Sequence, residues 1–170
     1  FDSTATGNNS TALFDSTANG SGAQAFYSST ATGSGSYAYS ASSAVGNNSF
    51  ALYSSNAVGY SSTAALGSNA IGNYSTAVFG SNAVGNYSSA TGTYSVAMGN
   101  GSTADSAYST AVGAYSSATN TSATALGAYS VASGVNSTAS GANAQATFDG
   151  ATATGANSLA GNTNTTANGV

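Results

Sequence analysis

The sequence predicts an all-β protein in the form of a parallel β-solenoid of 13–14-residue two-strand coils. Three observations predict this fold. An alanine recurs every six or seven residues, a glycine follows every second one of these alanines, and small residues alternate with larger ones between them. Repeats of this length are typical of solenoids, in which each coil packs only on its neighbours.

Alanine sets the frame of the repeat. From Ala5 to Ala83 the steps alternate between seven and six residues, and from there to Ala167 every step is seven. Serine stands two residues before the alanine in 20 of the 25 units, and glycine stands two residues after every second alanine. The resulting Ser-x-Ala-x-Gly pattern has the two-residue period of a β-strand, whereas a helix needs apolar residues at three- and four-residue spacing. We therefore expect two short strands in each coil, with serine and alanine facing inward.

The chain is expected to form a single repetitive segment over residues 1–170, a piece of a longer fibre. The 13-residue coils cover about 1–85 and the 14-residue coils about 86–170. The extra residue falls in one turn, which runs from Val78 to Ser81 in the first part and from Thr91 to Ser95 in the second. We expect a change in assembly geometry or in exposure near residues 85–95.

The composition argues against several classes of function. The chain has no Lys, Arg, His, Glu or Cys, and its net charge of −4 comes from four aspartates. Nucleic-acid binding is not expected without cations to neutralise phosphates, and neither is a catalytic site, a metal site or a cofactor. No stretch is apolar for long enough to insert into a membrane. Asp2 and Asp15 fall one coil apart, where solvated or capping carboxylates are favoured over a paired-carboxylate site.

The outward residue after each alanine of the glycine-ending strands forms a column that is apolar over seven consecutive coils. An exposed apolar column of this length indicates a partner surface, and self-association is the favoured interpretation. We predict that these residues form a subunit interface: Val45, Val58, Ile71, Val84, Met98, Val112 and Leu126. The equivalent column on the second strand begins with Leu13, Phe26, Tyr39 and Leu52 and turns polar near the change in coil length.

Tyrosines and asparagines recur at equivalent positions of successive coils. Stacked amides are expected at Asn56, Asn69 and Asn82, because amide side chains hydrogen-bond along such ladders. Exposed tyrosine is a good contact residue, although simple stacking that stiffens the coils explains the same pattern. The possible surface contacts are Tyr74, Tyr87, Tyr94, Tyr108, Tyr115 and Tyr129.

Several strands resemble a known family signature. The stretches 55–59, 68–72, 81–85, 95–99 and 109–113, for example Ser-Val-Ala-Met-Gly at 95–99, are similar to the core motif of the YadA-like heads of trimeric autotransporter adhesins. The resemblance covers essentially the whole chain. It implies a left-handed β-roll, a homotrimer with the residue before glycine in the trimer interior, and an extracellular location. The outer-membrane anchor would lie in parts of the protein outside this segment.

A non-catalytic adhesin or fibre segment is therefore the favoured function, with attachment to matrix proteins, other cells or abiotic surfaces. The 13-residue coils and the missing surface charges depart from the family pattern, in which 14-residue coils and charged surfaces are common. Two alternatives remain open. Outward threonine pairs such as Thr4 and Thr6 are typical of ice-binding solenoids, and a purely structural filament or tail-fibre segment has the same sequence features.

Overall fold

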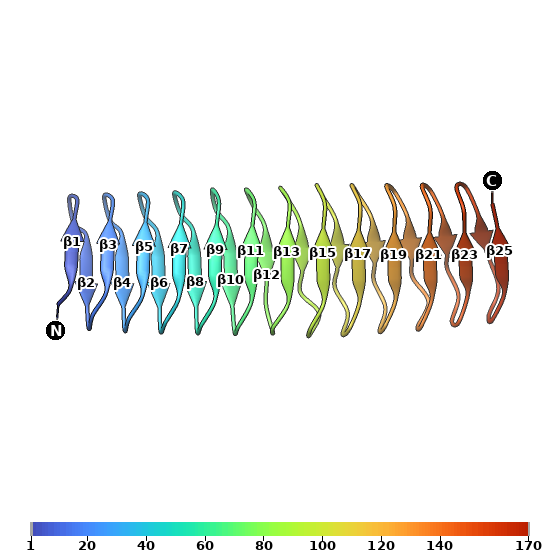
Figure 1. Ribbon diagram of the computed structural model, residues 1–170, viewed down its shortest axis with the longest axis horizontal. Coiled ribbons are helices and arrows are strands. Elements are labelled where there is room, and N and C mark those ends of the chain that lie inside the picture. The colour runs from blue at the N-terminus through green and yellow to red at the C-terminus, as the bar shows by residue number, and fades with distance from the viewer. Residues whose placement is uncertain (1, 170) are drawn as a thin grey trace. The chain divides into compact units, whose positions relative to one another are not determined.

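The computed structural model describes residues 2–169, and these fold into short strands connected by tight turns (Figure 1). The chain divides into two compact units, of which the first ends at Gly80 and the second begins at Ser81. In each unit the odd-numbered strands form one parallel sheet, called sheet A below, and the even-numbered strands form a second parallel sheet, sheet B. Each unit is therefore a parallel β-solenoid of two-strand coils, as the sequence predicts.

Unit 1 contains strands β1 to β12. Each strand pairs in register with the equivalent strand of the next coil, as Thr63 of β10 does with Thr76 of β12. Sheet A of unit 1 consists of β1 (Thr4–Thr6), β3 (Thr17–Asn19), β5 (Thr30–Thr32), β7 (Ser43–Val45), β9 (Asn56–Val58) and β11 (Asn69–Ile71). Sheet B consists of β2 (Thr11–Leu13), β4 (Gln24–Phe26), β6 (Tyr37–Tyr39), β8 (Phe50–Leu52), β10 (Thr63–Ala65) and β12 (Thr76–Ala77).

Unit 2 contains strands β13 to β25. The sequence spacing between equivalent strands is now longer by a single residue, as the pairing of Asn82 in β13 with Val96 in β15 shows. Sheet A of unit 2 consists of β13 (Asn82–Val84), β15 (Val96–Met98), β17 (Thr110–Val112), β19 (Thr124–Leu126), β21 (Thr138–Ser140), β23 (Thr152–Thr154) and β25 (Thr166–Asn168). Sheet B consists of β14 (Ser89–Ala90), β16 (Thr103–Ala104), β18 (Ser117–Ala118), β20 (Val131–Ala132), β22 (Gln145–Ala146) and β24 (Leu159–Ala160).

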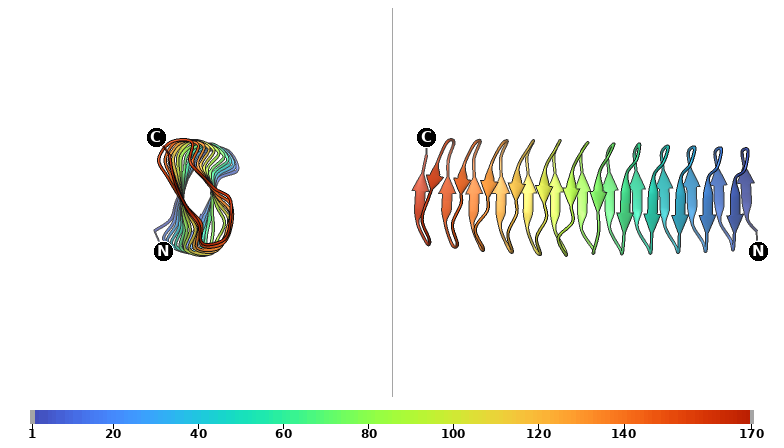
Figure 2. Two further views of the ribbon diagram at one scale, coloured as in Figure 1. Left: turned by 90° about the vertical axis from the view of Figure 1, so that its right-hand side faces the viewer. Right: turned by 180° about the vertical axis from the view of Figure 1, so that it is seen from behind.

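The interior of each coil is made of alanine and serine. Every frame alanine from Ala18 to Ala153 is fully buried, and the frame serines from Ser16 to Ser158 are at most 4% exposed. The strands of each coil face one another across this narrow interior (Figure 2). The prediction of an alanine and serine interior is confirmed, and all larger side chains are left to the outer faces and turns.

The glycine that ends each sheet A strand is required by the close approach of successive coils. Gly59 has a φ of 137°, and a Cβ atom built on it would lie 2.4 Å from the carbonyl oxygen of Gly72 in the next coil. No side chain fits between two backbones at this distance. A glycine in this column therefore sets the stacking distance of the coils, which is close to the ~4.8 Å spacing of paired strands.

The difference between 13- and 14-residue coils lies in the turn from sheet B to sheet A. In unit 1 this turn has two central residues with positive φ, such as Phe14 at 59° and Asp15 at 60°. Type I′ turns have the same φ signs. In unit 2 the turn has one more residue and at most one non-glycine residue with positive φ, such as Tyr94 at 55°. Because a left-handed non-glycine residue costs roughly 1–2 kcal/mol, the longer turn is the less strained form.

The interior serines solve a hydrogen-bonding problem that the short turns of unit 1 create. In these turns the serine N–H reaches no carbonyl of its own turn and instead donates to the serine hydroxyl one coil away. Ser55 N–H donates to Ser42 Oγ at 3.2 Å, and Ser42 N–H donates to Ser29 Oγ at 3.1 Å. In the longer turns of unit 2 the N–H bonds within the turn, as Ser109 does to Ser106 O at 3.1 Å.

These hydrogen bonds explain at which of the interior serine positions alanine occurs instead. Ala123 and Ala151 stand at serine positions of unit 2, where their N–H groups donate to carbonyls of their own turns, those of Asn120 and Phe148, at 3.0 Å. Ala23 lies in the turn from sheet A to sheet B, which begins with a glycine and is called the glycine turn below. The N–H of Ala23 donates to Gly20 O at 3.1 Å. No alanine stands at the serine position of a two-residue turn in unit 1. Serine is therefore needed where its oxygen is the only acceptor for the next coil.

We predict that Ser42→Ala destabilises the protein by about 1–3 kcal/mol, because it leaves the buried N–H of Ser55 without an acceptor. The matched control is Ser36→Ala. Ser36 is also buried, but its own N–H donates to Gly33 O at 3.3 Å, and its hydroxyl donates to the same carbonyl oxygen. The control should cost less than about 1 kcal/mol. Denaturant unfolding followed by circular dichroism measures both, and equal losses would contradict the proposed role of Ser42.

Candidate interaction surfaces

The predicted apolar column lies on the outer face of sheet A in unit 1. Val45, Val58 and Ile71 are consecutive residues of this column on β7, β9 and β11, and their Cα atoms pair in register. Their side chains are 38%, 39% and 44% exposed. The column begins with Thr6, Asn19 and Thr32, so it changes from polar to apolar within unit 1.

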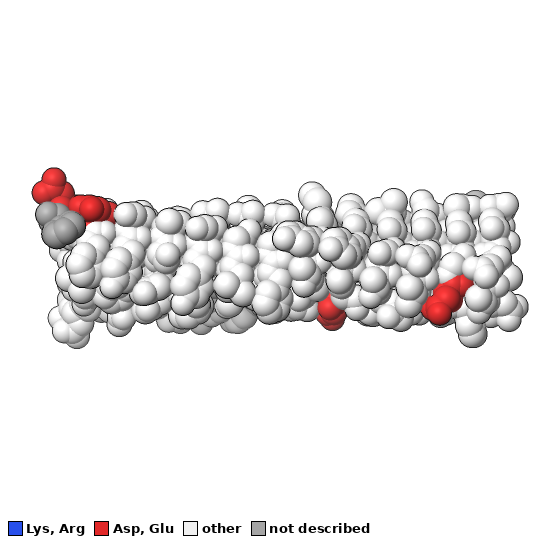
Figure 3. All heavy atoms as spheres, turned by 90° about the horizontal axis from the view of Figure 1, so that it is seen from below, with Lys and Arg blue, Asp and Glu red and all other residues white. Residues whose placement is uncertain are grey.

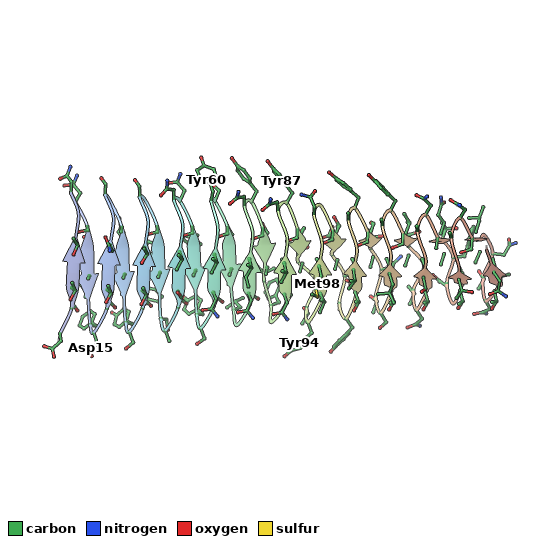
Figure 4. The ribbon with its side chains drawn as sticks, turned by 45° about the horizontal axis from the view of Figure 1, so that its top comes forward. Asp15, Tyr60, Tyr87, Tyr94 and Met98 are labelled. Carbon is green, nitrogen blue, oxygen red and sulfur yellow. The ribbon has the colours of Figure 1, made fainter. Side chains whose placement is uncertain are left out.

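Unit 2 carries an equivalent column on its own sheet A. Val84, Met98, Val112 and Leu126 pair in register, and Met98 and Leu126 are exposed. Met98 is labelled in Figure 4. After Leu126 the column becomes polar with Ser140 and Thr154. In both units the predicted residues therefore face outward, and their role as a subunit interface stays a prediction.

Polar ladders flank the apolar column. Asn56 Nδ2 donates to Asn69 Oδ1 at 2.8 Å, as expected for stacked amides. Other amides bridge coils at the turns: Tyr60 N–H donates to Asn73 Oδ1 at 3.0 Å. Such bonds hold side chains of neighbouring coils in register without using charge.

The tyrosines predicted as surface contacts lie in the turns and are exposed. Tyr115 and Tyr129 stack in the glycine turn of unit 2, with ring centroids 5.4 Å apart. Tyr94 and Tyr108 stack in the other turn at 6.0 Å. Tyr87 and Tyr94 project from opposite turns of unit 2 (Figure 4). In unit 1, Tyr74 meets Tyr60 edge-on at 5.2 Å.

An aromatic cluster lies on sheet B of unit 1 and its adjoining turns, and it extends beyond the outward column that contains Phe26 and Tyr39. Phe14 and Tyr27 stack at 4.7 Å, and Tyr37 and Phe50 stack at 5.1 Å. Edge contacts connect Tyr39 to Tyr27 at 5.2 Å and to Tyr53 at 5.7 Å. Phe26 lies between the two groups, 5.8 Å from Tyr37 and 6.5 Å from Tyr39.

The prediction named only Phe26 and Tyr39 of these rings, because it followed the residue after each alanine. The signal that would have found the others is the one-coil spacing of Phe14 from Tyr27 and of Tyr37 from Phe50. The cluster belongs entirely to unit 1, and sheet B of unit 2 carries polar residues such as Thr103 and Ser117 at equivalent positions.

The aspartates serve structural hydrogen bonds between coils. Asp15 Oδ1 accepts from Asp2 N–H at 3.2 Å, and Asp149 Oδ1 accepts from Val135 N–H at 2.8 Å. Asp105 Oδ1 accepts from the hydroxyl of Thr91 at 2.8 Å. The rest of the face in Figure 3 is uncharged. Within residues 2–169 no three His, Cys, Asp or Glu side chains gather as metal ligands would.

Among residues 2–169 there is no helix whose length and hydrophobicity would allow it to cross a membrane.

The comparisons with known proteins decide the family. A model of the YadA head domain repeat matches residues 1–13, 79–102, 90–116, 104–131, 118–144 and 132–158, which together make up more than half of the chain. The chain belongs to the YadA head repeat family. The resemblance predicted from the strand motifs is thereby confirmed, and the family is one of adhesin head repeats.

The fold of this YadA-like chain is also found in a solved structure. The crystal structure of the collagen-binding domain of the Yersinia adhesin YadA matches with a TM-score of 0.59 and 32% sequence identity. The match covers 71% of this chain and 66% of that domain. A search of curated proteins finds no match.

The phenol of Tyr39, at the centre of the aromatic cluster, has a raised pKa. Burial is the largest cause that raises the pKa of Tyr39 above its ordinary value of 10.0, and the neighbouring phenols of Tyr27, Tyr53 and Tyr37 add to it. The folded state thus favours the neutral phenol. This contribution to stability is present below pH 10 and is lost as the pH rises through the raised pKa.

We predict that a difference titration of wild type minus Tyr39→Phe, followed by phenolate absorbance, has its midpoint above pH 10. Phenylalanine keeps the ring contacts and removes the ionisable group. In denaturant the same difference curve should return to about pH 10, the ordinary value for tyrosine. A midpoint at or below the ordinary value in the folded protein would show that the cluster does not shield Tyr39.

Proposed function

We propose that this chain is a non-catalytic head segment of a trimeric cell-surface adhesin. The single observation that carries the proposal is the match to the collagen-binding domain of the Yersinia adhesin YadA, at 32% identity over 71% of the chain. The absence of His, Cys, Lys and Glu from the sequence supports a binding role, because these residues supply most general bases and activated nucleophiles.

In this proposal three copies associate through the apolar columns of sheet A. The columns consist of Val45, Val58 and Ile71 in unit 1 and of Val84, Met98, Val112 and Leu126 in unit 2. Exposed aliphatic side chains in consecutive coils are an unusual feature of a monomer surface and are typical of an interface. Self-association fits because the column carries no charged residue that would select a charged partner, and the number three rests on the family resemblance.

The outer faces are left for attachment to a matrix protein, another cell or an abiotic surface. The turns carry exposed tyrosines that supply large contact areas with a polar tip. We place the segment outside the cell, with the outer-membrane anchor in other parts of the protein. The YadA domain binds collagen according to its description, so collagen is the first matrix protein to test.

We predict that the purified chain has the mass of three chains by light scattering, and that Val58→Asp with Ile71→Asp reduces it to one. Buried unpaired carboxylates would make the interface strongly unfavourable. The matched control places the same charges on sheet B of unit 1, with Thr63→Asp and Thr76→Asp, and should keep the wild-type mass. Circular dichroism confirms that all forms are folded. A wild-type mass of one chain, or equal loss in the control, would overturn the proposed interface.

We also predict that attachment depends little on salt. The chain has no cationic side chain and only four aspartates, so we expect most contacts to be apolar or neutral hydrogen bonds. Binding to collagen-coated, cell-coated and glass surfaces should change less than about twofold between ~0.05 and ~0.5 M NaCl, over which Debye screening of ion pairs changes strongly. Attachment that disappears at high salt would contradict this mode of binding, and no attachment to any surface would contradict the adhesin function.

Ice binding remains the second candidate, on one observation. Threonines at the outward position before the alanine pair in register on five successive sheet A strands of unit 2, namely β17, β19, β21, β23 and β25: Thr110, Thr124, Thr138, Thr152 and Thr166. Thermal hysteresis of the purified chain separates this function from adhesion. A freezing point depressed below the melting point would favour ice binding, whereas equal temperatures would exclude it.

A further inference from the structure

Unit 2 exposes two pairs of stacked tyrosines, one in each of its two turns. The rings of Tyr115 and Tyr129 lie 5.4 Å apart and 13° from parallel. Those of Tyr94 and Tyr108 lie 6.0 Å apart and 25° from parallel. All four side chains are between 53% and 63% exposed, so an oxidant in solution reaches them.

The backbone holds each pair in this arrangement. The members of a pair occupy the same turn position in successive coils, and both have a positive φ, 55° for Tyr115 and 58° for Tyr129. Tyr129 N–H donates to Ala114 O at 2.9 Å, and Tyr108 N–H donates to Thr93 O at 2.9 Å. The two phenols of a pair therefore emerge in parallel, separated by the spacing of adjacent strands.

On at least one side of each tyrosine pair, the equivalent residue of the next coil is not aromatic, so the stack ends there. Tyr115 lies over Gly101, since a Cβ atom on this glycine would be 2.8 Å from the tyrosine ring. One coil beyond Tyr129 the same position is Asn143, and one coil beyond Tyr108 it is Ser122. A reaction between neighbouring rings therefore has one obvious partner for Tyr129 and one for Tyr108.

The composition leaves tyrosine as the main site of one-electron oxidation. The chain contains no Cys, Trp or His and a single Met, but eleven Tyr. Thiols and indoles, which elsewhere intercept radicals, are absent from the sequence. A phenoxyl radical formed on an exposed tyrosine thus persists beside a second phenol one coil away.

We propose that the Tyr94–Tyr108 and Tyr115–Tyr129 pairs are sites of dityrosine cross-linking by a peroxidase that uses hydrogen peroxide. Each phenol loses one electron and one proton, and the two radicals form a carbon–carbon bond between their ortho (Cε) positions. Loss of the two ortho hydrogens from these carbons, with return of protons to the phenol oxygens, restores both rings. The two electrons and two protons removed overall reduce one hydrogen peroxide to two water molecules.

The stacked geometry distinguishes these pairs from the edge-on tyrosines of unit 1. In a near-parallel pair the ortho edges of both rings lie side by side next to the exposed hydroxyls. In the Tyr60–Tyr74 pair the rings are 69° apart, and in the Tyr39–Tyr53 pair they are 78° apart. There the edge of one ring points at the face of the other, so the two ortho carbons do not meet.

A dityrosine bond would join adjacent coils covalently in a chain that has no cysteine. Such a bond closes a loop of one coil, as a disulfide does in secreted proteins, and constrains the unfolded state. The two pairs lie in opposite turns of the coil, so unit 2 would have a covalent cross-link between adjacent coils at each of its two turns. The proposal stands on the ring geometry and is independent of the adhesin function.

The test treats the purified chain with a plant-type peroxidase and hydrogen peroxide and then cleaves it on the amino side of aspartate. Cleavage at Asp105 separates residues 15–104, which carry Tyr94, from residues 105–148, which carry the other three tyrosines. A Tyr94–Tyr108 bond keeps these two fragments joined on a denaturing gel. A Tyr115–Tyr129 bond gives dityrosine fluorescence within fragment 105–148 and a mass lower by two hydrogen atoms.

Two variants and a matched control complete the design. Tyr94→Phe should abolish the joined product and leave fluorescence within fragment 105–148, whereas Tyr115→Phe should do the reverse. Tyr60→Phe, which alters an edge-on pair, should change neither. Oxidation in denaturant should lose both specific products. The proposal is overturned if the two fragments separate completely after oxidation, if the products link different chains, or if the variants behave like the control.

Discussion

The contact of each coil's backbone with that of the next is the constraint on which the rest of the structure depends. At Gly59 the next coil lies so close that even a methyl group would overlap its carbonyl. Within the coil the two strands leave space only for alanine and serine. With so small an interior, stability must come from the continuous ladder of hydrogen bonds and close contacts between coils rather than from large buried side chains.

The turns show how strictly this stacking governs the sequence. A two-residue turn needs two left-handed residues and a serine hydroxyl to receive the next coil's N–H, as Ser42 does for Ser55. One added residue removes one left-handed position and satisfies the N–H within the turn. That change frees the serine position, so alanine stands there at Ala123 and Ala151. The length of a single turn thus determines which interior residues each unit tolerates.

The same regularity determines how much could be predicted from sequence. The inward alanines, the outward Val58 and Ile71, and the Asn56–Asn69 amide bond follow from a two-residue period and a fixed coil length. The aromatic cluster was underestimated because contacts such as Phe26 with Tyr37 depend on side-chain rotamers and on residues outside the column followed. Positive φ at Phe14 or Tyr94 has no propensity signal, because aromatic residues rarely adopt it. The repeat pattern shows which residues face outward, but the number of associating chains depends on how these outward faces pack against one another.

The interior positions hold alanine or serine in nearly every coil, so the coils differ mainly in their outward columns. We propose that the sheet A column is buried between identical chains. The most direct measurement is oxidation of Val58→Cys, in a chain that otherwise has no cysteine, followed by non-reducing electrophoresis, with Thr76→Cys on sheet B as control. We expect a disulfide-linked pair of chains for Val58→Cys and single chains for the control. Single chains for both variants, or equal linkage in both, would contradict this proposal.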